Sequence, residues 1–93
     1  MESNLETFRL AVSIVNYKSS LLVCNLLPTL ISQLDLDTDR IIVIDNKSPD
    51  NSVSEIQSFI EKRNWQEFVK LIPAEVNGGF SYGNNLAIET AIN

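Results

Sequence analysis

The chain has 93 residues, enough for one small domain, and its 12 acidic and 7 basic side chains give a net charge of −5, which disfavours a nucleic-acid partner. It contains no histidine, and this excludes imidazole-based chemistry within the chain. Its single cysteine, Cys24, permits no internal disulfide, and no apolar run approaches the roughly 20 residues of a transmembrane helix, so we expect a cytoplasmic protein without a transmembrane segment.

The first predicted strand is Leu10–Tyr17, a nearly continuous apolar and β-branched run that is typical of a strand covered on both faces. A helix is predicted next, from a cap at Ser19 or Ser20 to about Gln33, because its apolar residues recur every three or four positions. Pro28 falls inside that helix and removes one backbone hydrogen bond. We therefore expect the helix to kink or to split in two.

The second predicted strand is Arg40–Asn46, with the sequence RIIVIDN. Ser52 and Glu55 have the spacing of a capping box at the start of a second helix. The predicted inner stripe of that helix consists of Val53, Ile56, Phe59 and Ile60. The third strand is predicted at Val69–Val76, and Pro73 within it favours an edge position in the sheet.

All three glycines of the chain lie in residues 77–85, between the third strand and a helix predicted at 86–92. Short apolar strands that alternate with helices predict an α/β fold: a three-layer sandwich with a short parallel sheet in the order 3-2-1 and helices on both faces. Ligands of such sheets bind outside the carboxyl ends of the strands. Here those ends are Tyr17-Lys18, Asp45-Asn46 and Asn77-Gly78-Gly79.

Several known kinds of α/β site are excluded by the residues at these ends. The turn from Asn16 to Ser20 has no glycine, as a dinucleotide fold requires, and no Walker-type phosphate loop occurs. Asn16 and Tyr17 are not the acidic residues of a response-regulator receiver. What remains is the carboxylate of Asp45, which can accept hydrogen bonds from a ribose or a base, and the ring of Tyr17, which can stack. Asp45 can equally be a turn-forming residue, and Tyr17 a rim or core aromatic.

Three blocks of the chain, LAVSIVNYKSS, RIIVIDNKSPDNS and NGGFSYGNNLAIETA, resemble the opening half of the inverting nucleotide-sugar glycosyltransferases of family 2, which have the GT-A fold. The third block is similar to the rhamnosyltransferase-like branch. The resemblance implies that the nucleotide is bound by residues from all three blocks. These are Asn16, Tyr17, Asp45, Asn46, Ser48, Asn77, Gly79, Phe80, Asn84 and Asn85. The family commonly has a basic residue at the position of Asn84.

Complete enzymes of this family continue into a strand with an Asp-x-Asp motif that holds Mg²⁺ or Mn²⁺, and later supply a carboxylate base. We expect neither in this chain, and therefore no catalytic residue, no metal ligand and no cofactor of its own. Two Asp-x-Asp spacings do occur, within residues 35–39. They precede the second strand, so we expect them in a solvated loop at the opposite edge of the sheet.

Residues 1–9 form a polar lead that we expect to be flexible. The resemblance implies a nucleotide-sugar-binding half-domain of residues 10–93, which lacks the metal-binding and acceptor half. Such a chain would bind a nucleotide-diphospho-sugar weakly and would belong to an enzyme that transfers a sugar to a saccharide or lipid-linked acceptor. The isolated chain would be inactive. An exposed edge of the first strand predicts a homo-oligomer. Two alternatives remain: a non-catalytic remnant or interaction module, and a nucleotidyltransferase-like domain, for which the turn after the first strand lacks the usual basic, glycine-rich loop.

Overall fold

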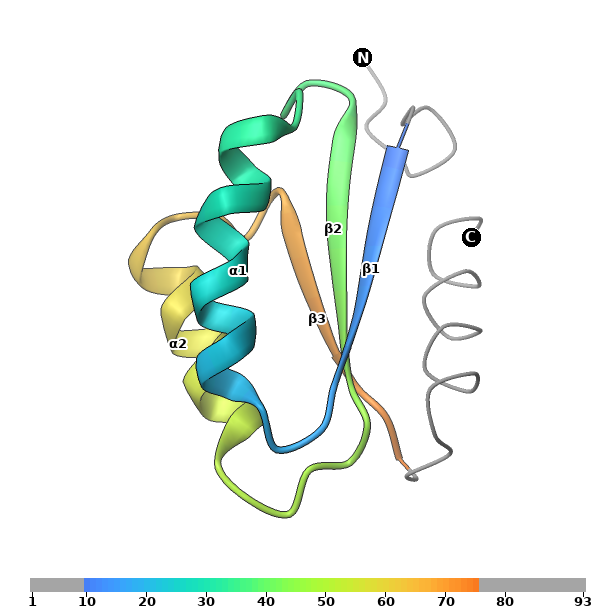
Figure 1. Cartoon of the computed structure of the whole chain (residues 1–93), viewed down its shortest axis with the longest axis vertical. Helices are drawn as coiled ribbons and strands as arrows, with labels where there is room; N and C mark the ends of the chain where they lie inside the picture. The colour runs from blue at the N-terminus through green and yellow to red at the C-terminus, as the bar shows by residue number, and fades with distance from the viewer. Residues whose placement is uncertain (1–9, 76–93) are drawn as a thin grey trace.

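The computed structural model describes residues 10–75 and contains three strands and two helices in strict alternation (Figure 1). The elements are β1 (Leu10–Asn16), α1 (Ser20–Gln33), β2 (Asp39–Asp45), α2 (Ser52–Lys62) and β3 (Val69–Pro73). The strands form one parallel sheet in the order β1-β2-β3. The predicted α/β alternation, parallel pairing and strand order are therefore confirmed.

The register aligns the carboxyl ends of the strands. β1 pairs with β2 from Leu10 opposite Asp39 to Asn16 opposite Asp45. β2 pairs with β3 in the same direction, and its last pair joins Asp45 to Pro73. All three strands consequently end at one edge of the sheet, which is the lower edge in Figure 1.

Both described helices lie on the same face of the sheet (Figure 1). The chain moves across the sheet in one direction, from β1 to β2 to β3, and right-handed crossovers then place successive helices on one face. The third predicted helix, at 86–92, and the predicted lead of residues 1–9 lie outside the described residues.

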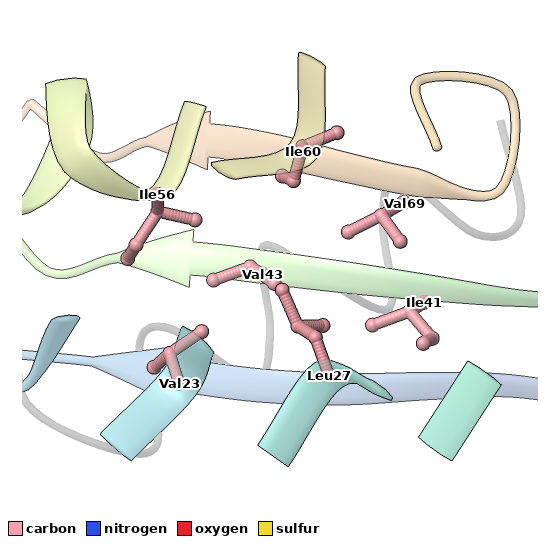
Figure 2. Close-up of a cluster of buried hydrophobic side chains, with 7 residues drawn as sticks. All are labelled: Val23, Leu27, Ile41, Val43, Ile56, Ile60 and Val69. Atoms are coloured by element: carbon pink, nitrogen blue, oxygen red, sulfur yellow. The ribbon is translucent and has the colours of Figure 1, made fainter. Parts of the chain in front are cut away.

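The main core lies between this face and the two helices, where seven side chains point toward one another (Figure 2). They are Val23 and Leu27 of α1, Ile41 and Val43 of β2, Ile56 and Ile60 of α2, and Val69 of β3. All seven residues of β2 are buried. Because side chains alternate along a strand, Ile42 and Ile44 point to the opposite face, where they pack with Ala74. The apolar run of β2 thus marks the central strand.

Helix α1 is continuous through Pro28, so the predicted split does not occur. Its apolar residues also do not share one face. Leu27 is completely buried, whereas Leu21 and Leu22 are 72% and 69% exposed. The helix is therefore apolar on its outward side as well as on the side that packs on the sheet.

The capping box predicted for α2 is wrong. The helix has Asn51 as its N-cap, without a side-chain capping bond, and Ser52 is its first residue. Glu55 does not reach back to the helix start. Its carboxylate accepts a hydrogen bond from Ser20 Oγ at 2.5 Å, so it joins α2 to the start of α1. The inner stripe is confirmed for Ile56 and Ile60, which are buried in the core, and for Phe59, which packs against it, but Val53 does not join that cluster.

Strand β3 ends at Pro73, earlier than the sequence predicts. Within the described sheet it pairs only with β2, so the expected edge position of Pro73 is confirmed. Aromatic rings close the amino end of the sheet. Trp65 contacts Phe59 edge-to-face with centroids 6.0 Å apart, and the Arg40 guanidinium lies 5.3 Å from the centre of the Phe68 ring.

Candidate functional site

Backbone hydrogen bonds continue one step past the strand ends and hold the carboxyl edge together. The N–H of Asn46 donates to the carbonyl of Asn16 at 2.8 Å, and the N–H of Ala74 donates to the carbonyl of Asp45 at 2.8 Å. Three segments that are far apart in the sequence therefore meet at this edge. The edge is where parallel α/β sheets place their ligand sites.

A buried side-chain network links the first two of these segments. Asp45 Oδ1 accepts hydrogen bonds from Asn16 Nδ2 at 2.8 Å and from Ser48 Oγ at 2.7 Å. Asp45 Oδ2 accepts the backbone N–H of Ser48 at 2.9 Å. Asn16 and Asp45 are each only 1% exposed. The network thus brings Asn16, Asp45 and Ser48 together, as the sequence predicts.

The hydrogen bonds to Asp45 fix the direction of its carboxylate. A carboxylate has about four acceptor positions. The bonds from Asn16 and Ser48 occupy both positions on Oδ1 and one on Oδ2. Among the hydrogen bonds formed within residues 10–75, one acceptor position on Oδ2 remains, and a single N–H or O–H of a ligand would match it.

Asn16 is used at both ends of its amide. Its nitrogen donates to Asp45, while its oxygen accepts the backbone N–H of Ser19 at 3.2 Å, just before α1 begins. Asn16 therefore caps the approach to α1 in place of Ser19, whose own side chain makes no capping bond. Both polar atoms of the Asn16 amide are therefore used in hydrogen bonds within the protein.

Tyr17 and Lys18 follow β1 and form the exposed rim of this edge, in the loop next to the network. Tyr17 is 42% exposed, and its carbonyl accepts a hydrogen bond from Ser19 Oγ at 3.1 Å. The Lys18 ammonium lies 5.6 Å from the centre of the Tyr17 ring, within the range of a cation–π contact. The backbone N–H of Lys18 donates to Ser48 Oγ at 3.0 Å. The loop after β1 and the loop after β2, which we call the rim loops, are therefore in direct contact.

Lys18 and Lys47 share an unusual backbone conformation, and sequence reasoning did not single out this feature. Each has φ of 55°, in the left-handed region that favours glycine. Lys18 follows β1 and Lys47 follows β2, so the two lie in neighbouring loops at the same edge. No glycine or asparagine marks these positions, and a lysine carries no sequence signal for this conformation.

Asp50 adds a carboxylate to the exposed side of the edge. Its Oδ1 accepts the backbone N–H of Ser52 at 3.0 Å. Hydrogen bonding from Ser52 lowers the pKa of Asp50 from its ordinary value, and the nearby Lys18 ammonium contributes in the same direction. Asp50 is therefore ionised at neutral pH and partly offsets the charge of Lys18.

The acidic residues 35–39 lie at the opposite edge, as the sequence predicts, because Asp39 begins β2. The expected solvated loop does not include Asp39, which is 4% exposed. The carboxylates of Asp35 and Asp39 accept hydrogen bonds within this segment. Asp35 Oδ1 accepts the N–H of Asp37 at 3.1 Å, and Asp39 Oδ2 accepts the N–H of Asp35 at 3.0 Å. Within residues 10–75, no group of three or more Asp, Glu, Cys or His side chains is arranged to hold a metal ion.

Five predicted nucleotide-binding residues fall outside the described part of the chain: Asn77, Gly79, Phe80, Asn84 and Asn85. Of the other five, Asn16, Tyr17, Asp45 and Ser48 meet at the carboxyl edge. Asn46, the last, is 4% exposed, and its backbone N–H is the one that bonds to Asn16. Among residues 10–75, no helix is both long and apolar enough to cross a bilayer.

Comparisons with known proteins agree with this geometry. Residues 11–92 match the model of glycosyl transferase family 2. The fold is similar to that of a solved mannosyltransferase from Pyrobaculum calidifontis, PcManGT in complex with GDP-Man and Mn²⁺, with a TM-score of 0.78 and 17% sequence identity. That match covers 96% of this chain and 26% of the mannosyltransferase. A search of curated proteins finds no match.

Proposed function

The chain belongs to glycosyl transferase family 2, and we propose that it binds the nucleotide of a nucleotide-diphospho-sugar as the N-terminal portion of an enzyme that transfers the sugar to a saccharide or lipid-linked acceptor. The observation that carries this proposal is the meeting of Asn16, Asp45 and Ser48, from the ends of two different strands, next to the exposed Tyr17 that follows Asn16. A family assignment alone would not say where the ligand lies. The position of this network favours a ligand site at the carboxyl edge of the sheet.

The roles that we propose for the individual residues follow from the exposure and hydrogen bonds of their side chains. Tyr17 presents a ring on which a base can stack. Asp45 offers its one remaining acceptor position to a base N–H or a ribose hydroxyl, while Asn16 and Ser48 hold the carboxylate in place. The roles of Asn46, Asn77, Gly79, Phe80, Asn84 and Asn85 as further nucleotide contacts remain part of the proposal and rest on the family resemblance.

Catalysis by the whole enzyme is also a proposal, because this chain spans 26% of the length of the mannosyltransferase it resembles. That enzyme was solved with Mn²⁺. We propose that a divalent metal and the acceptor are held by parts of the enzyme beyond this half-domain. The 93 residues alone should then bind a nucleotide diphosphate weakly and transfer no sugar.

Binding can be tested by calorimetric titration of the chain with uridine, thymidine and guanosine diphosphates. We expect at least one of them to bind, with a dissociation constant below a few millimolar. Tyr17→Ala should weaken that binding about tenfold, because stacking of a base on an aromatic ring contributes about 1–3 kcal/mol. Tyr17→Phe keeps the ring and is the matched control, with affinity close to that of the unaltered chain. No binding of any of the three diphosphates at millimolar concentration would contradict the proposal.

A specific observation favours an interaction module as the second candidate. The outward side of α1 exposes three leucines, Leu21, Leu22 and Leu26, and a helix that is apolar all round is ordinarily covered by other protein. In this reading the fold is kept for binding a protein partner and the chain takes no nucleotide. The titration above separates the two candidates.

We also propose that the chain self-associates through β1. In the described sheet β1 pairs on one side only, with β2, and Leu10 at its start is 47% exposed. Strand edges that are apolar and unpaired tend to recruit another chain. The cytoplasm remains the proposed location.

A further inference from the structure

The cations of residues 10–75 are divided unequally between the two ends of the sheet. Arg40 and Lys70 lie at the starts of β2 and β3, and Lys62 and Arg63 lie at the end of α2, so these four belong to the amino end. Among the described residues, Lys18 and Lys47 are the only cations at the carboxyl edge, where the candidate site lies.

The backbone beneath both lysines is firmly held. Lys18 donates its N–H to Ser48 Oγ, and Lys47 lies between buried Asn46 and Ser48, which is bonded twice to Asp45. Both lysines adopt φ of 55°, a conformation that residues other than glycine usually avoid. Residues held in sparsely populated conformations cluster at functional sites, because the surrounding structure must enforce them. The two αL positions place two ammonium groups in adjacent, tied loops.

The carboxylates at this edge have other hydrogen-bond donors. Asp45 accepts from Asn16 and Ser48, and Glu55 accepts from Ser20. Asp50 accepts the Ser52 N–H, and the Lys18 ammonium interacts with its carboxylate. No carboxylate within residues 10–75 forms an ion pair with Lys47. Within the described part of the chain, the charge of Lys47 is thus not neutralised by an ion pair.

We propose that Lys18 and Lys47 together bind the phosphate groups of the nucleotide ligand and give the site its preference for a diphosphate over a nucleoside. This inference rests on the proposed function. The Lys18 ammonium is 5.6 Å from the centre of the Tyr17 ring, so a ligand that stacks on the ring brings its own anionic group close to a cation. A nucleoside diphosphate combines an aromatic base with such a group.

The experiment compares dissociation constants for guanosine and uridine, for their monophosphates and for their diphosphates. It uses the unaltered chain and the variants Lys18→Gln and Lys47→Gln. We expect each variant to weaken diphosphate binding about fivefold at low ionic strength, which corresponds to a charge pair about 4 Å apart in water. Nucleoside binding should not change. The diphosphate affinity of the unaltered chain should fall as salt is added.

Three further variants control for indirect effects. Lys70→Gln removes an exposed positive charge from the amino end of β3 and should change diphosphate affinity less than twofold. Lys47→Gly removes the ammonium while fitting the φ of 55° without strain, so it should lose affinity as Lys47→Gln does and still fold. Lys47→Arg keeps the charge and should retain most of the affinity.

The outcomes separate this inference from the function on which it rests. If no nucleoside or nucleotide binds, the proposed function fails and the inference with it. If nucleotides bind but both lysine variants match Lys70→Gln, the inference alone is overturned. The same holds if the variants weaken nucleosides as much as diphosphates, because the lysines would then act on the base or on the loop.

Discussion

Asp45 connects the ends of two strands through side-chain hydrogen bonds. Its carboxylate accepts from Asn16 at the end of β1 and twice from Ser48 in the loop after β2. Because it is 1% exposed, water cannot replace an acceptor that is lost. The residue therefore has two roles in our account: it fixes the rim loops and offers one acceptor position to the ligand.

We predict that Asp45→Ala lowers the free energy of unfolding by about 1–3 kcal/mol, because it leaves donors of Asn16 and Ser48 without an acceptor. Asp37→Ala is the matched control, since Asp37 is exposed at the opposite edge, and it should change stability by about 0.5 kcal/mol or less. Urea denaturation followed by circular dichroism measures both. Equal stability of the two variants would refute the role of Asp45 as a clamp.

Lys47 gives a second prediction at this scale, which concerns its backbone. With φ of 55°, Lys47→Gly should leave stability unchanged or raise it by up to about 1 kcal/mol. Lys47→Val should lower stability by about 1–2 kcal/mol, because a β-branched residue fits this conformation poorly. Thermal unfolding of the two variants side by side tests the assignment. A valine variant as stable as the glycine variant would mean that the loop does not hold this conformation in solution.

At the level of the elements, the sequence predicts the strands and helices well because burial imposes a pattern on them. The run from Ile41 to Ile44 has no room for polar residues in a strand covered on both faces, and its position in the centre of the sheet follows. Helix α2 is likewise marked by Ile56 and Ile60 at one-turn spacing. The local pattern does not predict contacts between residues that are far apart in the chain. Glu55 has the spacing of a capping residue, but its carboxylate accepts a hydrogen bond from Ser20, which is 35 positions away.

The candidate site also has features that the sequence predicts and features that depend on contacts between distant residues. Topology alone predicts that Asn16, Asp45 and Ser48 share one edge, because parallel strands end together. The left-handed conformations of Lys18 and Lys47 cannot be read from the chain, since they depend on the hydrogen bonds that tie the two loops. The sequence therefore predicts the carboxyl edge of the sheet and the carboxylate of Asp45. The structure is needed to find the two lysines at the same edge.

For helix α1, we predict that truncation of a leucine lowers stability far more on the side that faces the sheet than on the outward side. Leu27→Ala should lower the free energy of unfolding by about 2–5 kcal/mol, because Leu27 is completely buried in the main core. Leu22→Ala removes the same atoms from a position that is 69% exposed and should cost less than about 1 kcal/mol. Denaturant titration of both variants compares the two sides. A large loss from Leu22→Ala would show that the outward side is covered in solution.

At the level of the whole molecule, two surfaces are candidates for association: the edge of β1 and the outward side of α1. We predict that Ala11→Lys, at an exposed position of β1, shifts the chain from oligomer to monomer, because charge on an edge strand disfavours edge pairing. Leu22→Lys on α1 is the comparison and should leave the oligomer intact. Light scattering coupled to size exclusion at high micromolar concentration gives the mass. A monomeric unaltered chain, or a loss of oligomer with Leu22→Lys alone, would contradict association through β1.

The central claim is that a nucleotide binds at the carboxyl edge of the sheet, between the loops after β1 and β2. The most direct test is a map of backbone amide chemical shifts as the chain is titrated with a nucleoside diphosphate that it binds. We predict the largest shifts at Tyr17, Lys18 and Ser48, and none at Asp37 or Asn64 at the other end of the sheet. Shifts concentrated around Asp37 and Asn64, with the carboxyl edge unchanged, would contradict the account.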